Sequence, residues 1–220
     1  MTGPGLRDTK SFYLDHEPGE LVASALVSWA KERAGAEVLD LGCATGGYCL
    51  ALSRLGFRCT GVDVNAAYVE RAREAGVEAR HVAPGDALPF ADRSFDTVLL
   101  FEVLEHVADY ASLLAEARRV ARRNVLVTVP NNGAEPLLRA ASLTFDHMLD
   151  VDHVNFFTEE TLAKALSGFS WFRVEQREHK DLSLLARLLP PPVALVVAGL
   201  VAVRLVRPRL SFRLYAEARP

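Results

Sequence analysis

One stretch decides the fold of this chain: Val38-Leu39-Asp40-Leu41-Gly42-Cys43-Ala44-Thr45-Gly46-Gly47. Its start is apolar apart from one acid, its end is a glycine-rich turn, and residues 48–55 then carry apolar side chains at helical spacing. This order predicts a buried parallel strand, a tight turn and the start of a helix. Because glycine adds no side chain and permits positive φ, such a turn can bring backbone N–H groups close to a ligand.

The bulk composition narrows the function. The 220 residues are 50% hydrophobic and carry a net charge of −3, which gives no electrostatic reason to expect a nucleic-acid partner. Cys43, Cys49 and Cys59 form no CxxC pair, so we expect neither a zinc cage nor a disulfide framework. The first ten residues are polar and do not resemble a signal peptide. A cytoplasmic location is the default expectation.

The same alternation of apolar runs and helical stripes continues along the chain. Predicted strands cover 38–41, 57–63, 77–82, 95–101, 125–129, 169–178 and 210–218, and predicted helices cover 21–33, 48–55, 66–75, 108–123 and 158–166. Strands that alternate with helices predict a parallel α/β sheet with right-handed crossovers. We expect a single domain over 1–220, with an apolar helical insertion at about 182–206.

Acidic residues stand at or just after the ends of four predicted strands: Asp40, Asp63, Asp86 and Glu102. Ligands of open α/β sheets bind at the carboxyl ends of the strands, where these side chains converge. The sequence therefore places a binding site at this edge of the sheet.

The glycine turn fits two kinds of ligand. Read as G-x-G-x-x-G it gives Gly42, Ala44 and Gly47, and Asp63 follows at a spacing that also suits a dinucleotide site. Asp40 argues against that reading, because a carboxylate at the mouth of the turn would repel a pyrophosphate. It suits a ligand that has no phosphate and carries positive charge, such as S-adenosylmethionine (SAM).

With these features the sequence resembles the class I SAM-dependent methyltransferases, and in particular their ubiquinone-biosynthesis O-methyltransferase-like branch. The resemblance covers roughly 38–166 and rests on residues 38–46, Gly61-Val62-Asp63, residues 85–90 with Ser94-Phe95-Asp96, and residues 101–107. It implies a Rossmann-like, mostly parallel seven-stranded sheet with helices on both faces and a terminal antiparallel hairpin. Ala44 departs from the family's first motif, which has glycine there.

The resemblance also implies that SAM is the cofactor. The candidate cofactor-binding residues are Tyr13, Asp40, Gly42, Cys43, Gly46, Asp63, Val64, Asp86, Ala87, Phe101 and Glu102. Gly42 and Gly46 would let the backbone approach the cofactor, and Asp40 would meet its amino group directly or through water. Asp63 would hold the ribose hydroxyls by charge-assisted hydrogen bonds. Asp86 would accept from the adenine amino group, with Ala87 donating from its backbone.

Two histidines, His106 and His153, are the candidate catalytic residues, because a hydroxyl acceptor needs its proton removed. Glu102, Glu105 and His106, together with His153, also resemble the metal ligands of ubiquinone-biosynthesis O-methyltransferases and small-RNA 2′-O-methyltransferases. By that resemblance the four residues would hold a divalent metal such as Mg²⁺. The alternative is a metal-free site, since the Glu-x-x-Glu-His pattern also occurs in metal-free relatives.

The most apolar part of the chain, 182–206, includes eleven uncharged residues at 193–203, which are too few to cross a bilayer. It is expected to form a buried lid or a homodimer contact, or else to dock peripherally on a membrane with its arginines at the headgroups.

The expected partner is a small-molecule, glycan or lipid-linked acceptor. The sequence thus predicts a SAM-dependent methyltransferase acting on an oxygen. An NAD(P)-dependent oxidoreductase and a non-catalytic SAM-binding protein are the alternatives.

Overall fold

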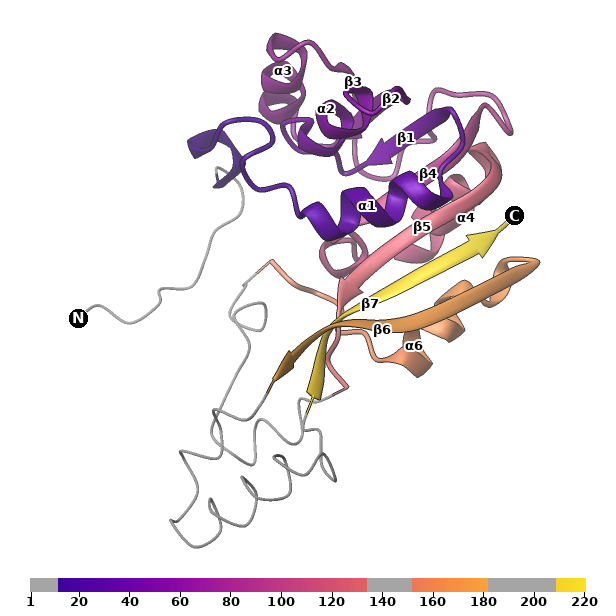
Figure 1. Ribbon diagram of the computed structural model, residues 1–220. Helices are drawn as coiled ribbons and strands as arrows, with labels where there is room; N and C mark the ends of the chain where they lie inside the picture. The colour runs from indigo at the N-terminus through magenta and orange to yellow at the C-terminus, as the bar shows by residue number, and fades with distance from the viewer. Residues whose placement is uncertain (1–11, 134–151, 182–208) are drawn as a thin grey trace, which may run out of the picture.

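The computed structural model describes residues 12–133, 152–181 and 209–220 (Figure 1). One sheet has the strand order β3-β2-β1-β4-β5-β7-β6. The strands are β1 (Glu37–Leu41), β2 (Arg58–Asp63), β3 (Glu78–His81), β4 (Phe95–Phe101), β5 (Ala121–Pro130), β6 (Trp171–Asp181) and β7 (Arg209–Arg219). The first five run parallel, and β7 pairs antiparallel with both β5 and β6. The predicted fold class is confirmed, terminal antiparallel hairpin included.

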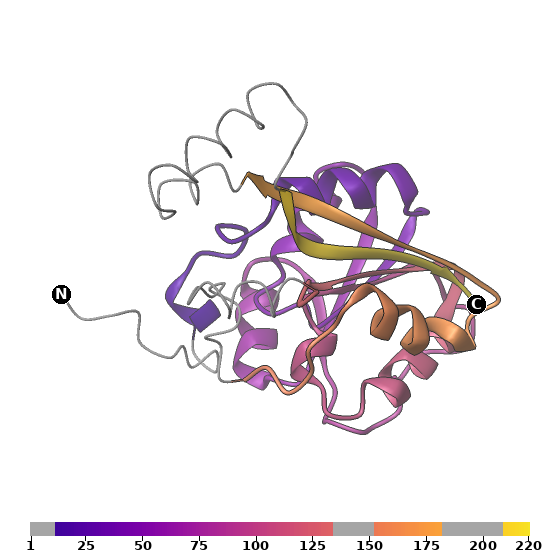
Figure 2. The same cartoon turned by 90° about the horizontal axis from the view of Figure 1, so that it is seen from below.

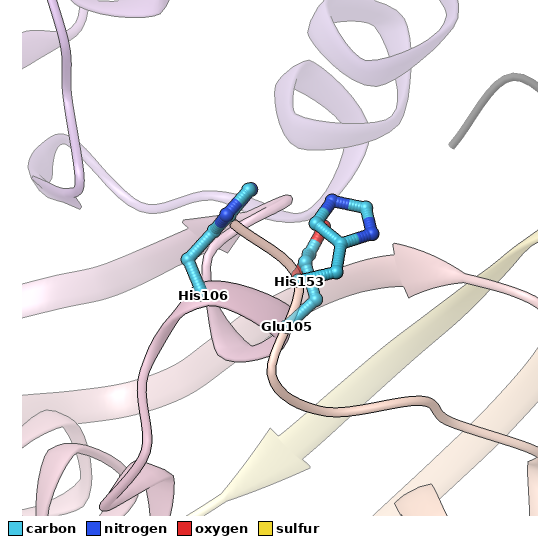
Figure 3. Close-up of side chains that lie close together, drawn as sticks. All are labelled: Glu105, His106 and His153. Carbon is cyan, nitrogen blue, oxygen red and sulfur yellow. The ribbon is translucent and has the colours of Figure 1, made fainter. Parts of the chain in front are cut away.

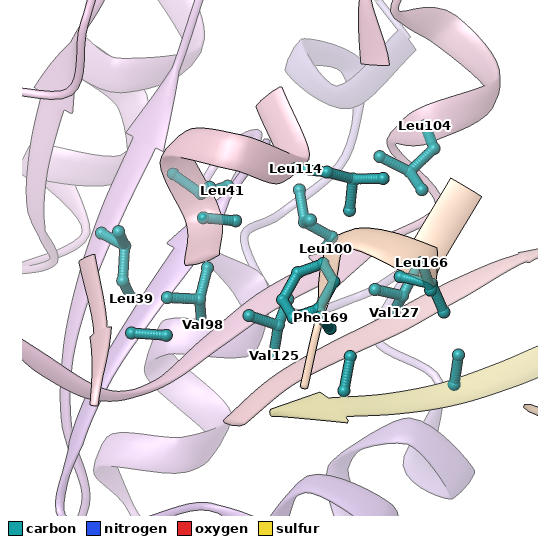
Figure 4. Close-up of a cluster of buried hydrophobic side chains, with 14 of the residues drawn as sticks. Leu39, Leu41, Val98, Leu100, Leu104, Leu114, Val125, Val127, Leu166 and Phe169 are labelled. Atoms are coloured by element: carbon teal, nitrogen blue, oxygen red, sulfur yellow. The ribbon is translucent and has the colours of Figure 1, made fainter. Parts of the chain in front are cut away.

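Helices cover both faces of this sheet (Figures 1 and 2). They are the 3₁₀ helix η1 (Phe12–Asp15), α1 (Ser24–Arg33), α2 (Gly47–Ser53), α3 (Ala66–Glu74), the 3₁₀ helix η2 (Leu104–His106), α4 (Tyr110–Val120), α6 (Glu159–Ala165) and the 3₁₀ helix η4 (Leu166–Gly168). On one face, α1 and α2 pack through Leu26, Trp29 and Leu52 against the strands. On the other, Leu114 of α4 and Leu166 beside α6 meet the strand side chains drawn in Figure 4. Strands buried from both sides explain the nearly continuous apolar runs of the sequence.

The expected helix over 108–123 is the one clear error among the predicted elements. The helix α4 ends at Val120, and residues 121–123 already belong to β5. The N–H of Arg93 donates to the carbonyl of Arg119 (2.8 Å), and Arg122 forms an ion pair with Asp96 of β4 (2.5 Å). These contacts hold the chain at the start of β4, so pairing with that strand replaces the last helical turn.

Two further expectations stay predictions. The predicted insertion at 182–206 lies outside the described residues. The single-domain organisation stays a prediction. Within the described ranges, no helix combines the length and the apolar character that crossing a bilayer requires.

Candidate active site

The glycine turn closes onto the end of β2. The N–H groups of Gly42 and Cys43 both donate to the carbonyl of Val62, at 2.8 and 3.0 Å. Gly42 has φ of +79° and Gly46 has φ of +84°. A Cβ atom on Gly42 would lie 2.6 Å from Val103 Cγ2. Glycine is therefore required at position 42 both by the backbone conformation and by the close approach of η2.

The carboxylate of Asp63 links this turn to β2. Its Oδ2 accepts from the N–H of Ala44 and its Oδ1 from the N–H of Asn65, both at 2.8 Å. Burial raises the pKa of Asp63, and these backbone N–H groups oppose that rise. Each oxygen keeps acceptor capacity for a ligand hydroxyl, so the fixed carboxylate suits a ribose. The neighbouring Val64 is 58% exposed and offers an apolar surface beside it.

Ala44 stands where the family motif has glycine, and the structure shows how the turn accommodates its side chain. It adopts the left-handed conformation with φ of +46°, which costs a residue with a Cβ about 1–2 kcal/mol. Its N–H nonetheless reaches Asp63. The turn therefore keeps its shape with alanine at some expense in stability.

Asp40 is the most unusual acid at this edge. It is only 2% exposed, and its pKa is raised to about 7, mainly by burial and further by the charge of Asp63. The thiol of Cys49, 3.8 Å from Oδ2, partly opposes this rise. A buried carboxylate that lacks a cation favours the binding of a positively charged ligand.

Replacing Asp40 with Asn separates stability from binding. Asp40 titrates at pH 3.8 when exposed and near 7 when folded, so the folded state binds more protons in that window. Stability therefore falls as the pH rises from about 4 to 7. Above pH 7 we expect Asp40→Asn to melt at a higher temperature than the wild type, with the difference vanishing towards pH 4. Its SAM affinity should fall, by calorimetry, because the negative charge is gone. The exposed Asp15→Asn, which removes one carboxylate away from this site, serves as the control.

The other predicted cofactor-binding residues differ in their exposure: two have buried side chains and two are exposed. The thiol of Cys43 packs on the backbone of Gly61, where a Cβ would lie 2.6 Å from the sulfur, so this side chain faces the core. Phe101 is also buried, against Tyr48 and Trp29, which leaves only its backbone for a ligand. Asp86 and Ala87 are exposed on the loop that follows β3.

Tyr13 reaches this edge from η1. Its ring packs edge-on against Tyr68, with centroids 5.6 Å apart. Burial raises the pKa of Tyr13 to about 12, and the charges of Glu102 and Glu105 contribute to the rise. The hydroxyl therefore stays protonated and lies among the strand-end carboxylates, where it can donate a hydrogen bond.

The carboxylate of Glu105 and the imidazoles of His106 and His153 form a compact group (Figure 3). One ligand atom from each lies within 4.8 Å of the others, and the two imidazole rings have centroids 4.6 Å apart. Glu105 is 1% exposed. The structure thus brings together three of the four residues predicted as metal ligands, and both predicted catalytic histidines.

Glu102, the fourth predicted ligand, is not part of this group. Its φ of +55° turns it away from the path of β4, and its carboxylate lies 3.1 Å from Nε of Arg213 on β7. Arg213 is also paired with Glu178 (2.5 Å), which likewise has a left-handed φ, of +54°. The structure does not bring Glu102 into the group of Glu105, His106 and His153, because the largely enclosed Arg213 takes up its charge.

Asn155 is a functional candidate that the sequence analysis did not single out. Its side-chain amide donates to the carbonyls of Leu104 (2.9 Å) and Val107 (2.8 Å). The backbone N–H groups of Val154 and Asn155 donate to the carbonyl of Glu105. These four bonds fasten the loop that carries His153 onto η2. The only sequence signal is an amide two residues after a histidine, which does not reveal a contact with residues about fifty positions away.

Asn155→Ala should loosen this attachment. Losing two side-chain hydrogen bonds is expected to cost about 1–3 kcal/mol of stability. We expect methyl transfer to slow about tenfold through misplacement of His153, with SAM affinity unchanged. Asn155→Asp, which cannot donate, should behave like the alanine variant. Val154→Ala, at an exposed neighbouring side chain, is the matched control. Wild-type kcat in both Asn155 variants would contradict the assignment.

The chain is similar in sequence to known methyltransferases. Residues 39–129 match a family model described as a methyltransferase domain. Over 134 residues the chain is 35% identical to a probable S-adenosylmethionine-dependent methyltransferase of Mycolicibacterium smegmatis, covering 59% of this chain and 49% of that protein. Over 85 residues it is 40% identical to a ubiquinone biosynthesis O-methyltransferase of Chelativorans sp., covering 36% of this chain and 34% of that protein. The match thus spans half or less of these curated relatives.

A solved structure agrees over nearly the whole length. The SAM-dependent methyltransferase of Archaeoglobus fulgidus superposes with a TM-score of 0.68 and covers 95% of this chain and 99% of that chain. The two sequences are 19% identical, so this likeness bears on the fold.

Proposed function

We propose that this chain is a class I SAM-dependent methyltransferase and that it methylates an oxygen of a small-molecule, glycan or lipid-linked acceptor. The observation that carries the proposal is the meeting of Glu105, His106 and His153 beside the strand-end acids. A hydroxyl must lose its proton as it attacks, and an imidazole is suited to remove it.

The proposed cofactor contacts follow from the same edge of the sheet. SAM supplies an electrophilic methyl group, so the protein has mainly to align the acceptor and exclude water. Asp63 holds the ribose hydroxyls, Val64 contacts the adenine ring, and Asp40 attracts the positively charged end. Tyr13 lies above these groups and limits the access of water.

We further propose that Glu105, His106 and His153 hold a divalent cation. Their ligand atoms are close enough to share one ion, and two imidazoles with one carboxylate suit Mn²⁺, Fe²⁺ or Zn²⁺ better than the oxygen-preferring Mg²⁺. Such an ion would supply Lewis acidity that lowers the pKa of an acceptor hydroxyl, and the two histidines would then hold the ion instead of removing the proton themselves. Elemental analysis of the purified protein tests this. One equivalent of metal that is lost in Glu105→Gln supports it, and full activity of metal-free protein in chelator refutes it.

An apolar, quinone-like or lipid-linked acceptor is the favoured class. One curated relative is named for ubiquinone biosynthesis and O-methylation. The uncharged run at 193–203 is consistent with an apolar acceptor that is reached at a membrane surface. The alternative role for that segment is a homodimer contact.

The test uses SAM with an isotopically labelled methyl group. The protein is incubated with catechols, quinols, glycans and lipid extracts, and products are found by mass spectrometry and assigned by the ¹³C shift of the new methyl group. An O-methyl product supports the proposal. A methyl group on nitrogen or carbon overturns the oxygen assignment. SAM binding by calorimetry without any product would indicate a non-catalytic SAM-binding protein.

A further inference from the structure

A second concave site lies at the opposite edge of the sheet from the strand-end acids. It is a hollow of about 630 Å³ where β4 and β5 begin and α4 ends, and we name it the arginine pocket. Its cationic lining is Arg93, Arg118, Arg119, Arg122, Arg123 and Arg219. Among the residues that the structure describes, no aspartate or glutamate side chain lines it, and the single carboxyl group is the terminal one of Pro220. Six guanidinium groups in one hollow are notable in a chain whose net charge is −3.

Nearby acids neutralise only part of this charge. Arg119 is paired with Glu116 (2.7 Å) and Asp92 (2.8 Å), and Arg122 is paired with Asp96. Arg219 stacks on the ring of Trp171, with its centroid 4.5 Å away. Paired arginines of this kind supply fixed donors but little net charge.

The other three arginines keep their charge. Arg93, Arg118 and Arg123 form no ion pair with any residue in 12–133, 152–181 or 209–220, although Arg118 donates to the carbonyl of Gly168 (2.6 Å). Arg93 is held with a left-handed φ of +54° by its N–H bond to the carbonyl of Arg119. Such strain in a non-glycine residue persists only where the surroundings enforce it, and it is common at binding sites.

We propose that the arginine pocket binds a small soluble ligand that carries two or more phosphate groups. Guanidinium groups bind phosphate oxygens by paired, charge-assisted hydrogen bonds, and clustered arginines are suited to several phosphates at once. The volume of the hollow is in the range of small-molecule sites. The net negative charge of the chain disfavours an extended polyanion such as RNA. Because the pocket is at the far edge of the sheet from Asp63, the ligand would bind together with SAM.

Calorimetric titration with inorganic tripolyphosphate tests the proposal on the full chain. We expect saturable binding that weakens at least tenfold in Arg93→Gln/Arg123→Gln, two exposed side chains without a described partner. The control Arg54→Gln/Arg80→Gln removes the same charge elsewhere and should bind within about twofold of the wild type. SAM affinity should be the same in all three proteins, which also shows that the variants are folded.

Titrations with ATP and with phosphoinositide vesicles show which kind of molecule carries the phosphates. Equal or tighter binding of ATP supports a nucleotide, and tripolyphosphate alone supports an inorganic or simple organic polyphosphate. Tight binding to vesicles that contain a phosphoinositide, without binding of either soluble probe, would overturn the soluble ligand. Equal weakening in the control variant, or equal binding of sulfate, would reduce the pocket to a general ionic effect and overturn the proposal.

Discussion

His153→Ala is expected to slow methyl transfer by about 10²–10⁴-fold, the usual contribution of a general acid or base, once an acceptor is in hand. The imidazole of His153 faces that of His106 beside the buried carboxylate of Glu105, so its loss leaves the group incomplete. SAM affinity should change little, because the proposed cofactor contacts involve other residues. Steady-state rates and SAM calorimetry on the same preparation provide the measurement.

Two further variants show whether the group acts as a unit. His106→Ala should cost about as much as His153→Ala, and the double variant should cost hardly more than either, since residues that share one task are not additive. Val154→Ala is the control for the same loop. A His153→Ala rate within threefold of the wild type would remove this histidine from the chemistry and leave it a packing role.

Asp63→Asn should weaken SAM binding by about 10–150-fold, which corresponds to the 1.5–3 kcal/mol attributed to hydrogen bonds that involve a charged group. The substitution keeps the shape of the side chain but removes the charge and one of the two acceptor oxygens. One of the N–H groups of Ala44 and Asn65 then loses its partner, so the turn loosens as well. Calorimetry with SAM, with circular dichroism as a check on folding, provides the measurement.

Asp86→Asn is the comparison for this second prediction. Asp86 is exposed on its loop, so water competes for its hydrogen bond and the loss of affinity should stay below tenfold. A folded Asp63→Asn variant that binds SAM as tightly as the wild type would be incompatible with a ribose contact at Asp63.

The strands of the sheet could be predicted from the sequence because each strand is marked by a pattern of neighbouring residues. Each strand is a short apolar run between turn signals, and Asp40 and Asp63 stand at strand ends that a parallel sheet brings to one edge. The same reasoning fails for residues 121–123, whose helical pattern is overruled by pairing with β4. Tertiary contacts decide such boundaries, and no local pattern reveals them.

The group of Glu105, His106 and His153 could be predicted only in part for the same reason. His106 and His153 were visible as isolated histidines, but the clamp by Asn155 joins two segments far apart in the chain. The pairing of Glu102 could not be predicted either, because its partner, Arg213, comes from a strand near the other end of the sequence. A spacing of three residues predicts that Glu102 and Glu105 share a face, whereas the left-handed φ of Glu102 breaks that relation.

The ladder of the long β6–β7 hairpin marks a point at which the chain can be altered. Asp181 and Arg209 are paired in this ladder, so the two ends of the connecting segment are held at neighbouring points of the sheet. Closing a loop across fixed ends costs only about 0.6 kcal/mol more for each doubling of its length. Evolution, or a protein engineer, can therefore replace that segment wholesale while Arg213 and Glu102 keep the hairpin fastened to the cofactor edge. Under the proposed function, such an exchange would give access to new acceptors without rebuilding the site proposed for SAM.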